Sequence, residues 1–339
     1  MRAHYDVLGI GNAIMDVIVP VDEATLVREN ITKASMTLID QTRALQLHGS
    51  LKKTGKNISE VAGGSGANTV AGVAALGVTA AYIGKVADDS LGKKFTQSLG
   101  ALGVTANTPP LKKGEATARC LIAVTPDGER SMSTYLGANV AFGVHDVDAE
   151  IVRASAVTYM EGYLFDTDDQ KAAFVKASEI ATAADRQVAL TLSDSFCVDR
   201  HRAAFAHLVD NHVDILFANE AELLSLYETN DLSVALNNVW ATGTTTLVTM
   251  SGKGSLIKNG GDVHEIPALP VEKIGDKVID TTGAGDQYAA GVLAGRAQGL
   301  SWPDAGRLGS VCASEVISHY GARPEADVHD LVAGGVKHL

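Results

Sequence analysis

The sequence predicts a doubly wound α/β fold, with a mostly parallel sheet covered by helices on both faces, joined to a small β-rich lid. Two observations support this prediction. Over most of the 339 residues, short apolar runs alternate with helix-like segments, which is the pattern of repeated βα units with doubly covered parallel strands. The hairpin signal Pro126-Asp127-Gly128-Glu129 interrupts that alternation and predicts a second, smaller group of strands.

The elements are predicted in order along the chain. Apolar residues 7–10 predict a first strand, whose pattern continues to residue 20, and the more polar stretch from 21 to 60 predicts a partly β segment. A helix is predicted over residues 67–76, because its apolar positions form one stripe and Gly77 follows as a natural stop. A second helix is predicted from the caps at 88–90 to residue 99. Further strands are predicted at residues 80–84, 117–124, 131–136, 156–160, 188–192, 214–218 and 244–250.

The hairpin strands at 117–136 and the polar early segment are both assigned to the lid, since neither fits the alternation of strand and helix. Strand and helix are expected to alternate from the end of the hairpin to the end of the chain. We therefore divide the chain into a large α/β domain and a discontinuous lid folded over the sheet edge. The large domain takes residues 1–13, 61–114 and 138–339, and the lid takes 14–60 and 115–137.

The composition limits the class of partner and the compartment. A hydrophobic content of 46% with 20% charged residues is typical of a globular enzyme. The formal net charge of −12 argues against a nucleic-acid or anionic-membrane partner, because both need a basic surface. No apolar run approaches membrane-spanning length, and the start of the chain carries no signal-peptide pattern. The three widely spaced cysteines indicate a reducing compartment, and we expect the cytoplasm.

The stretch Asp280-Thr281-Thr282-Gly283-Ala284-Gly285-Asp286 is the most informative motif. Its glycines let backbone N–H groups point at one spot, and the apolar run that follows predicts a helix, so an anion site forms at the helix N-terminus. A carboxylate inside an anion site fits a base that takes a proton from a hydroxyl while the amides hold developing negative charge. The motif therefore indicates phosphoryl transfer onto an alcohol.

A second group of residues indicates recognition of a sugar. Asn12 and Asp16 follow the first strand, and the glycine-rich run of residues 63–68 places Asn68 in the first turn of a helix. A carboxylate and an amide that converge on neighbouring hydroxyls supply the acceptors and donors that a sugar needs. The Gly9-Ile10-Gly11 start lacks the third glycine of a dinucleotide fingerprint, because Ile14 stands there, and no Walker-type phosphate loop occurs.

Residues 63–68 and 280–286 together resemble the two signatures of the ribokinase-like (PfkB) carbohydrate and nucleoside kinases, and the resemblance covers essentially the whole chain. It implies a doubly wound domain with a β-rich lid, ATP as phosphoryl donor and Mg²⁺ as helper. It implies that Asp286 is the catalytic base, with Gly283, Ala284 and Gly285 as the anion hole. It also implies that Asp16, Gly64 and Asn68 hold the sugar hydroxyls, and that Gly63-Gly64 is the hinge of the lid.

Two further segments resemble family elements that bind ATP. The run Asn219-Glu220-Ala221-Glu222 matches an N-x-x-E pattern in which the second Glu, here Glu222, orients water around Mg²⁺ and phosphate. Residues 249–254 resemble the turn that covers the ATP ribose and phosphates. The implied ATP contacts are Asn219, Thr249, Gly252, Gly254, Thr282, Gly283 and Gly285. Asp280 is implied as a place for a monovalent cation, K⁺ or Na⁺.

The chain also resembles the adenosine kinase branch of that family. The start Gly11-Asn12 with Asp16 fits the branch, and the resemblance implies that Asn12 contacts the acceptor. Tyr163 would stack on the adenine, and Arg130 would meet the transferring phosphate. Four apolar residues of the lid would close over the base: Met36, Leu38, Met132 and Leu136.

We therefore predict ATP- and Mg²⁺-dependent phosphorylation of the 5′-hydroxyl of a ribonucleoside, with adenosine converted to AMP in purine salvage as the first expectation. The acceptor is expected to be a small molecule. Gln287 after the catalytic Asp and the polar stretch at 193–197 differ from the branch pattern, so a sugar such as ribose or fructose, inosine and guanosine stay open as acceptors. A non-catalytic nucleoside or sugar sensor is the alternative of a different class. The sequence leaves monomer and dimer equally open.

Overall fold

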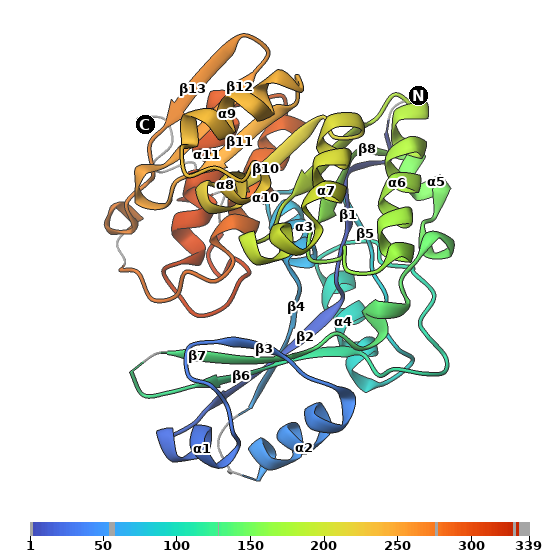
Figure 1. Cartoon of the computed structure of the whole chain (residues 1–339), viewed down its shortest axis with the longest axis vertical. Helices are drawn as coiled ribbons and strands as arrows, with labels where there is room; N and C mark the ends of the chain where they lie inside the picture. The colour runs from blue at the N-terminus through green and yellow to red at the C-terminus, as the bar shows by residue number, and fades with distance from the viewer. Residues whose placement is uncertain (1–2, 54–57, 128, 275–276, 328–329, 332–339) are drawn as a thin grey trace.

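The structure is a computed structural model, and it describes residues 3–53, 58–127, 129–274, 277–327 and 330–331. Its larger sheet has eight strands, of which the six from β5 to β11 pair in parallel (Figure 1). The spatial order is β13 (Asp262–Ile266), β12 (Ser255–Asn259), β11 (Thr245–Thr249), β10 (Ile215–Asn219), β9 (Gln187–Thr191), β8 (Ser155–Glu161), β1 (Tyr5–Ile10) and β5 (Ala80–Ile83).

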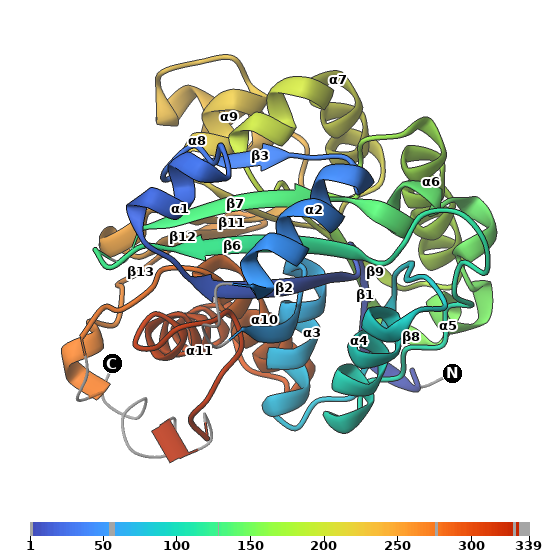
Figure 2. The ribbon, with the colours of Figure 1, turned by 90° about the horizontal axis from the view of Figure 1, so that it is seen from below.

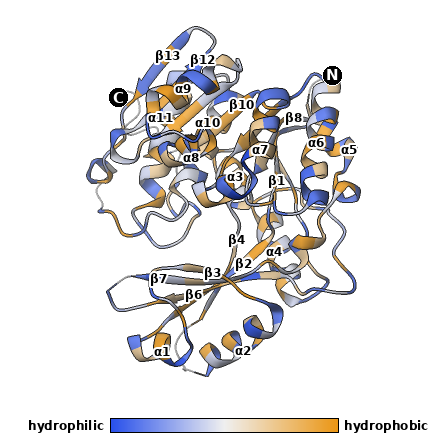
Figure 3. Cartoon of the chain, viewed as in Figure 1, coloured by the Kyte–Doolittle hydropathy of each residue, from blue (hydrophilic) through white to orange (hydrophobic). Residues whose placement is uncertain are grey.

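Helices cover both faces of this sheet, because its central strands present buried apolar residues to both sides. One face packs under α3 (Ser65–Ala75), α4 (Ser90–Ala101), α10 (Ala284–Ala297) and α11 (Trp302–Val316). The other packs under α5 (Ala149–Arg153), α6 (Asp168–Ala183), α7 (Ser195–Asn211), α8 (Glu220–Leu226) and α9 (Leu232–Ala241). The chain also forms short 3₁₀ turns, which are η1 (Gly137–Ala141), η2 (Val144–Asp146), η3 (Ser251–Lys253) and η4 (Val271–Ile274). Figure 3 shows helices such as α6 with both hydrophobic and hydrophilic residues, as expected for helices that cover a sheet.

A second sheet of five strands lies apart from the first, and we call it the lid sheet. Its order is β3 (Met36–Leu38), β7 (Arg130–Tyr135), β6 (Ala118–Val124), β2 (Ile14–Pro20) and β4 (Ser59–Gly63). Helices α1 (Glu23–Arg28) and α2 (Gln41–Lys52) pack on its outer face through a small core that includes Leu47, Leu51 and Leu121 (Figure 2). Its other face is turned toward the large sheet (Figure 1).

The mostly parallel sheet between two helical layers confirms the predicted fold class. The expectation that strand and helix alternate to the end of the chain is wrong at residues 255–266. There β12 and β13 form an antiparallel hairpin at the sheet edge, closed by Gly260 in the left-handed region with φ 58°. The Asn259-Gly260-Gly261 turn carried this signal, because such residues favour tight hairpins.

Some sequence predictions concern residues that lie outside the described ones. These residues are Gly128 of the predicted hairpin turn, residues 54–57 of the predicted lid, and residues 1–2 and 332–339 of the predicted large domain. The division of the chain into two domains stays a proposal. Along the described part of the chain, no helix is long and apolar enough to cross a membrane.

The strand order places the functional end of the large sheet. The chain adds β5 on one side of β1 and then β8 to β11 on the other, so the winding reverses between β1 and β8. Ligands of such sheets bind outside the carboxyl ends of the strands at this reversal point. Here Asn12 follows the end of β1 and Glu161 ends β8, and both ends face the lid sheet (Figure 1).

Candidate active site

A cavity of about 560 Å³ lies between the carboxyl ends of the parallel strands and the inner face of the lid sheet. It brings together most of the residues predicted from the sequence. They are Asn12, Asp16, Met36, Leu38, Gly64, Asn68, Met132, Leu136, Tyr163, Asn219, Glu222, Thr249, Thr282, Gly283, Ala284, Gly285 and Asp286. Five others, all within the described ranges, do not line it: Gly63, Arg130, Gly252, Gly254 and Asp280.

The Asp286 carboxylate lies where the N-termini of α10 and α3 meet. Gly283 caps α10 with φ 80°, a left-handed conformation that glycine adopts readily. Ser65 Oγ donates to Asp286 Oδ1 at 2.6 Å, and Asn68 Nδ2 donates to Oδ2 at 3.1 Å. Burial raises the pKa of Asp286, and these two hydrogen bonds oppose that rise. The carboxylate is therefore oriented in the cavity wall and can accept a proton.

Ser65 was not predicted as a site residue, although it lies within the glycine-rich motif. The side chain of Asn68 is oriented by Arg323, because Asn68 Oδ1 accepts from Arg323 Nε at 3.3 Å. Arg323 in turn donates from Nη1 to Ser98 Oγ at 2.9 Å. Arg323 could not be predicted from a local pattern, because it lies 255 residues from Asn68.

Gln287, which differs from the family pattern, has a structural role next to Asp286. Its side-chain amide donates to the backbone oxygens of Asn68 at 3.0 Å and Ala322 at 2.8 Å. A Cβ on Gly72 of the facing helix would collide with Gln287, so the long amide fills space that a glycine leaves. The glutamine thus ties α10 to α3 and to the segment after α11.

Asp16 lies on β2 and faces the same cavity. Burial raises its pKa to about 7, the charges of Arg323 and Arg130 oppose the rise, and the Asp286 carboxylate adds to it. A Cβ on Gly63 would overlap the Asp16 carboxylate, which explains a glycine at this position. Two carboxyl groups thus share one electrostatic environment, and a ligand with several hydroxyls would meet both.

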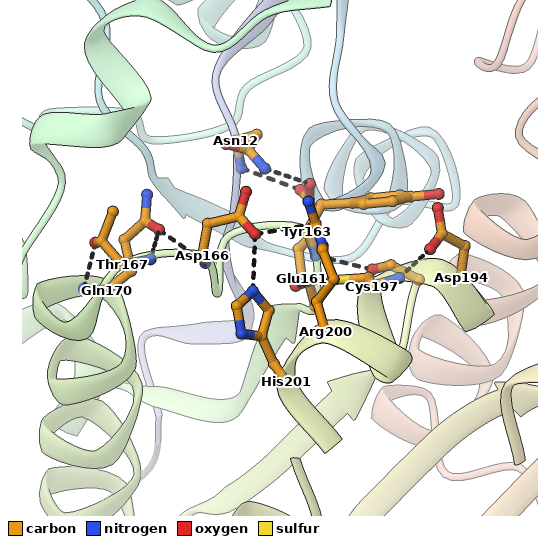
Figure 4. Close-up of polar contacts among 12 residues, drawn as sticks. Asn12, Glu161, Tyr163, Asp166, Thr167, Gln170, Asp194, Cys197, Arg200 and His201 are labelled. Atoms are coloured by element: carbon orange, nitrogen blue, oxygen red, sulfur yellow. Dashed lines mark hydrogen bonds and ion pairs between the residues drawn. The ribbon is translucent and has the colours of Figure 1, made fainter. Parts of the chain in front are cut away.

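Glu161 forms the floor beneath these residues, and the sequence analysis did not select it. Its carboxylate accepts from Asn12 N and Nδ2, both at 3.1 Å, and from Gly66 N at 2.7 Å (Figure 4). Burial raises its pKa to about 7. It joins the end of β1, the start of α3 and the end of β8. The one available signal was a charged residue that ends an apolar strand.

A polar wall stands near Tyr163 (Figure 4), whose side chain lines the cavity and is 37% exposed. Arg200 Nη2 pairs with Asp166 Oδ1 at 2.9 Å, and His201 Nε2 contacts the same oxygen at 2.9 Å. The Arg200 guanidinium carbon lies 4.9 Å from the centre of the exposed Phe196 ring. Arg200, Asp166 and Phe196 were not predicted, although the sequence analysis had noted the polar stretch nearby.

Arg130 and Asp280 are paired with each other outside the cavity lining. Arg130 Nη2 lies 2.7 Å from Asp280 Oδ2, and Arg130 Nη1 donates to Thr282 Oγ1 at 3.3 Å. Asp280 also accepts from Thr282 Oγ1 at 2.7 Å and from Gly321 N at 3.3 Å. This contact links β7 of the lid sheet to the loop before α10. The phosphate role of Arg130 and the cation role of Asp280 stay predictions.

Glu222 and Asn219 form a reciprocal cap at the start of α8. Asn219 N and Nδ2 donate to the Glu222 carboxylate at 3.0 and 2.6 Å, and Glu222 N donates back to Asn219 Oδ1 at 2.9 Å. Burial raises the pKa of Glu222 to about 7. Thr249 lines the cavity nearby, whereas Lys253 between Gly252 and Gly254 is exposed.

The side chains of the cavity offer few grouped ligands for a magnesium ion. Within the described residues, no three His, Cys, Asp or Glu side chains are grouped to hold a metal ion. Glu222 is one of several carboxylates in the cavity wall, and Asn219 already donates hydrogen bonds to it. Mg²⁺ keeps several waters and binds through one or two carboxylates plus substrate phosphates. The residues therefore fit an ion held mainly by water and phosphate, with Glu222 as a partner through water.

Comparison with known proteins places these features in a family. The model of the "pfkB family carbohydrate kinase" matches residues 29–328. "Adenosine kinase 2" of Arabidopsis thaliana is 24% identical, over 94% of this chain and 96% of its own length. Two solved structures are similar throughout. A "probable sugar kinase protein" from Rhizobium etli is 44% identical with a TM-score of 0.89, covering 99% of this chain and 100% of its own. The "adenosine kinase" from Sinorhizobium meliloti is 45% identical with a TM-score of 0.87, covering 98% and 99%.

Proposed function

The chain belongs to the pfkB family of carbohydrate kinases, and within that family we propose that it phosphorylates the 5′-hydroxyl of a ribonucleoside, with adenosine as the preferred acceptor. It is a phosphotransferase with a hydroxyl acceptor, it uses a small-molecule substrate, and ATP is the phosphoryl donor that its family implies. Similarity alone leaves the acceptor open, because the two solved relatives above carry the names of an adenosine kinase and a probable sugar kinase.

The observation that carries the proposal is the pairing of an aromatic ring with an apolar lid face in one cavity. Tyr163 follows β8, and four apolar residues come from β3, β7 and the residue after β7. These four are Met36, Leu38, Met132 and Leu136. A flat purine would gain from stacking on the ring and from burial against the apolar side chains. A free sugar has no such flat apolar surface.

The chemistry would be carried by Asp286 at the N-terminus of α10. Asp286 removes the proton of the acceptor hydroxyl, and a pKa raised by burial brings this carboxylate closer to the value suited to a base near neutral pH. Ser65 and Asn68 keep it oriented. The backbone N–H groups around Gly283, Ala284 and Gly285 stabilise the negative charge that spreads over the transferring phosphoryl oxygens.

We propose further roles around this centre. Asp16 and Asn68 would hold ribose hydroxyls, and the lid sheet would exclude water from the phosphoryl group. Magnesium, when bound, would neutralise charge on the donor phosphates, and Glu222 would orient its water. A monovalent cation near Asp280 stays part of the proposal. The three buried cysteines, all described and all free thiols, fit the expected cytoplasm.

A sugar kinase, or an inosine or guanosine kinase, is the second candidate, and the polar wall favours it. Arg200, Asp166 and Asp194 line the same cavity as Tyr163 and offer charged hydrogen-bonding groups that an apolar purine slot does not need. A hydroxyl-rich sugar, or a base with an oxo group, would use them. The acceptor panel below separates these candidates.

The first test is ADP production from ATP and Mg²⁺ with adenosine, inosine, guanosine, ribose and fructose as separate acceptors. We expect the highest kcat/KM with adenosine. Preference for a free sugar would overturn the nucleoside proposal and keep the kinase chemistry. ATP binding with no acceptor-dependent turnover would favour a non-catalytic sensor.

The same assay tests the base. The Asp286→Asn variant should lose at least ~100-fold in kcat, the scale for a general base, while it still binds adenosine in a calorimeter. Asp262→Asn is the matched control, because Asp262 is exposed at the start of β13 and far from the cavity lining. Near-normal turnover of Asp286→Asn would remove Asp286 from the mechanism.

A further inference from the structure

A second cavity of about 420 Å³ lies on the other side of the lid sheet. Its lining residues come from α2, β4, β6 and the start of α4, so it lies where the lid sheet meets α4. Figure 2 shows α2 and α4 as neighbours at this place. The cavity's charged and polar lining among the described residues is His48, Lys52, Glu60, Asp89, Ser90, Lys94 and Arg119. Among the residues that the structure describes, it shares no lining residue with the active-site cavity.

Two buried side chains in this cavity present hydrogen-bond donors without acceptors. Arg119 is 7% exposed and His48 is 8% exposed. Arg119 Nη1 lies 3.3 Å from His48 Nδ1. Because a guanidinium only donates, His48 Nδ1 is the acceptor, and the proton of the neutral ring is on Nε2. Within the described residues, neither Arg119 Nε nor His48 Nε2 has a hydrogen-bond partner. Native structures rarely leave such buried groups unpaired.

The charges around these donors favour an anion. Lys52, Lys94 and Arg119 are positive, whereas Glu60 and Asp89 are negative. The Asp89 carboxylate accepts three hydrogen bonds from neutral groups, Gly92 N, Thr117 N and Thr117 Oγ1, at 2.8, 2.9 and 2.7 Å, and these hold it at the start of α4.

Glu60 is shared among the cations of the cavity. It pairs with Lys94, lies 4.0 Å from Lys52 Nζ and lies 3.8 Å from His48 Nε2. Positive charge therefore exceeds negative charge even when His48 is neutral.

We propose that this cavity is a binding site for a small tetrahedral oxyanion, held by Arg119 and His48 at its buried end and by Lys52 and Lys94 at its mouth. An oxyanion supplies several acceptor atoms, which the two unpaired N–H groups lack, and its charge is matched by the lysines. The volume of the cavity admits such an ion with water around it.

The bound ion would act on the lid and not on the reacting groups. Lys94 and Asp89 belong to α4 of the large domain, whereas His48, Glu60 and Arg119 belong to the lid. Glu60 precedes the Gly63-Gly64 hinge on β4, and Arg119 is followed on β6 by Cys120, which lines the active-site cavity. An ion that contacts both sides would therefore stabilise the two parts in the arrangement seen here.

The site should also respond to pH through His48. Burial and the charges of Lys52 and Arg119 lower the pKa of His48, and the Glu60 carboxylate opposes this. A bound anion adds negative charge and favours the imidazolium, so binding takes up a proton. By linkage, affinity for the anion rises as pH falls through the range in which His48 titrates in the bound state.

Titration calorimetry with sodium sulfate on the whole protein tests the site, because sulfate does not titrate between pH 6 and 8. The Lys94→Ala variant should bind sulfate at this site at least ~10-fold more weakly, the scale for losing one charge-assisted hydrogen bond. Lys93→Ala is the matched control, since Lys93 is the neighbour on α4 and pairs with Asp88 outside the cavity. It should bind like the wild type.

A second arm uses His48→Gln, which should abolish the rise in sulfate affinity between pH 8 and pH 6. Sulfate that binds only at the anion hole of α10 would be insensitive to Lys94→Ala and His48→Gln alike, and that result would overturn the proposal. Equal weakening by Lys93→Ala and Lys94→Ala would also overturn it, because it would reduce the effect to general screening. Both arms measure binding, so they are independent of the acceptor and of turnover.

Discussion

At the scale of single residues, the active-site cavity is marked by carboxyl groups whose pKa is raised by burial. Asp16, Glu161 and Glu222 each have a pKa raised to about 7, and the pKa of Asp286 is raised as well. Such groups cluster where charge is moved or bound, because a site that excludes water strengthens every interaction within it. Their partners differ, and these differences allow the residues to be tested one by one.

The polar wall can be tested by a change at Arg200. If the base of a nucleoside lies against Tyr163, the Arg200 guanidinium and the Asp166 carboxylate are placed to meet polar atoms of its edge. Arg200→Ala should raise KM for the nucleoside about tenfold with kcat changed less than twofold, as expected for a contact made equally in ground and transition states.

Steady-state kinetics on Arg202→Ala gives the control for that change. Arg202 lies on the same helix and pairs with Asp199 and Glu228 away from the cavity. An unchanged KM for Arg200→Ala would place the base elsewhere in the cavity. A drop confined to kcat would give Arg200 a part in the phosphoryl transfer.

Glu161 should make stability depend on pH. Its pKa is about 7 in the folded protein and near 4.5 in the unfolded chain, so the folded state binds more protons between these values. The stabilising contribution is fully present below pH 4.5 and is lost as pH rises through 7. The melting temperature should therefore fall between pH 5 and pH 8 by less in Glu161→Gln than in the wild type.

Glutamine suits this test because its oxygen can still accept from Asn12 N and Gly66 N, which both reach Oε2 of the glutamate. Glu150→Gln, whose side chain is exposed on α5, is the control and should keep the wild-type slope. An identical slope in Glu161→Gln would assign the pH dependence to the other buried carboxyl groups.

The sequence was sufficient for site residues that belong to short motifs. Asp286, Asn68 and Asp16 could be predicted to share one cavity because each lies in a short motif at a helix start or a strand end. The residue types in those motifs, and their resemblance to the family signatures, indicate the function. Glu161 and Arg323 could not, because their roles depend on contacts with residues 95 to 255 positions away. A buried carboxylate that accepts from a distant strand end leaves no local pattern.

At the scale of elements, the two helix N-termini at Asp286 are held together by close packing. Helices α3 and α10 approach so closely that a Cβ on Gly72 would lie 2.7 Å from Ala290 Cβ and would also collide with Gln287. Gly72→Ala should therefore destabilise the protein by about 1–3 kcal/mol, the range for overpacking, although alanine is the better helix former.

Gly49→Ala on α2 is the matched control in urea unfolding, because among the described residues, apart from its chain neighbours and the helix's own backbone, no atom lies within 4 Å of its added Cβ. There the change should stabilise by about 0.5–1 kcal/mol, the usual gain of alanine over glycine inside a helix. A stabilised Gly72→Ala would mean that the two helices separate without cost. Loss of stability in both variants would point instead to effects on the unfolded chain.

Elements with a clear apolar pattern in the sequence were predicted well. Elements whose conformation depends on contacts with neighbouring elements were not. Parallel strands such as β1 and β8 are buried on both faces, so an apolar run is enough to identify them. The edge hairpin of β12 and β13 is partly exposed and has a weaker apolar signal. Helices α1 and α2 cover only the small lid core, so their apolar stripes are narrow and the sequence analysis assigned that stretch as partly β.

At the scale of the whole molecule, the lid sheet lies across the active-site cavity from the large sheet, and several polar contacts among the described residues link it to the rest of the chain. One of these is the pair of Arg130 and Asp280, with Thr282 as a second acceptor. Their side chains are 14% and 8% exposed, so the pair is largely shielded from solvent. It links β7 of the lid sheet to the loop before α10, where we propose the anion hole, so closure of the lid would be coupled to the shape of that loop.

A double-mutant cycle on this pair decides between two roles for Arg130. If Arg130 acts by holding the lid to the loop through Asp280, then Arg130→Ala, Asp280→Asn and the double variant should lose similar amounts of kcat, at least ~10-fold, because each removes the same contact. Arg28→Ala is the control for charge on the lid, since Arg28 is exposed and, among the described residues, pairs locally with Glu29 and Thr25.

If Arg130 instead meets the transferring phosphate, as the family resemblance implies, the loss of kcat in Arg130→Ala should exceed that in Asp280→Asn. The double variant would then combine two separate losses. Rapid-quench measurement of the first turnover supplies the readout, because it separates the chemical step from product release and lid opening.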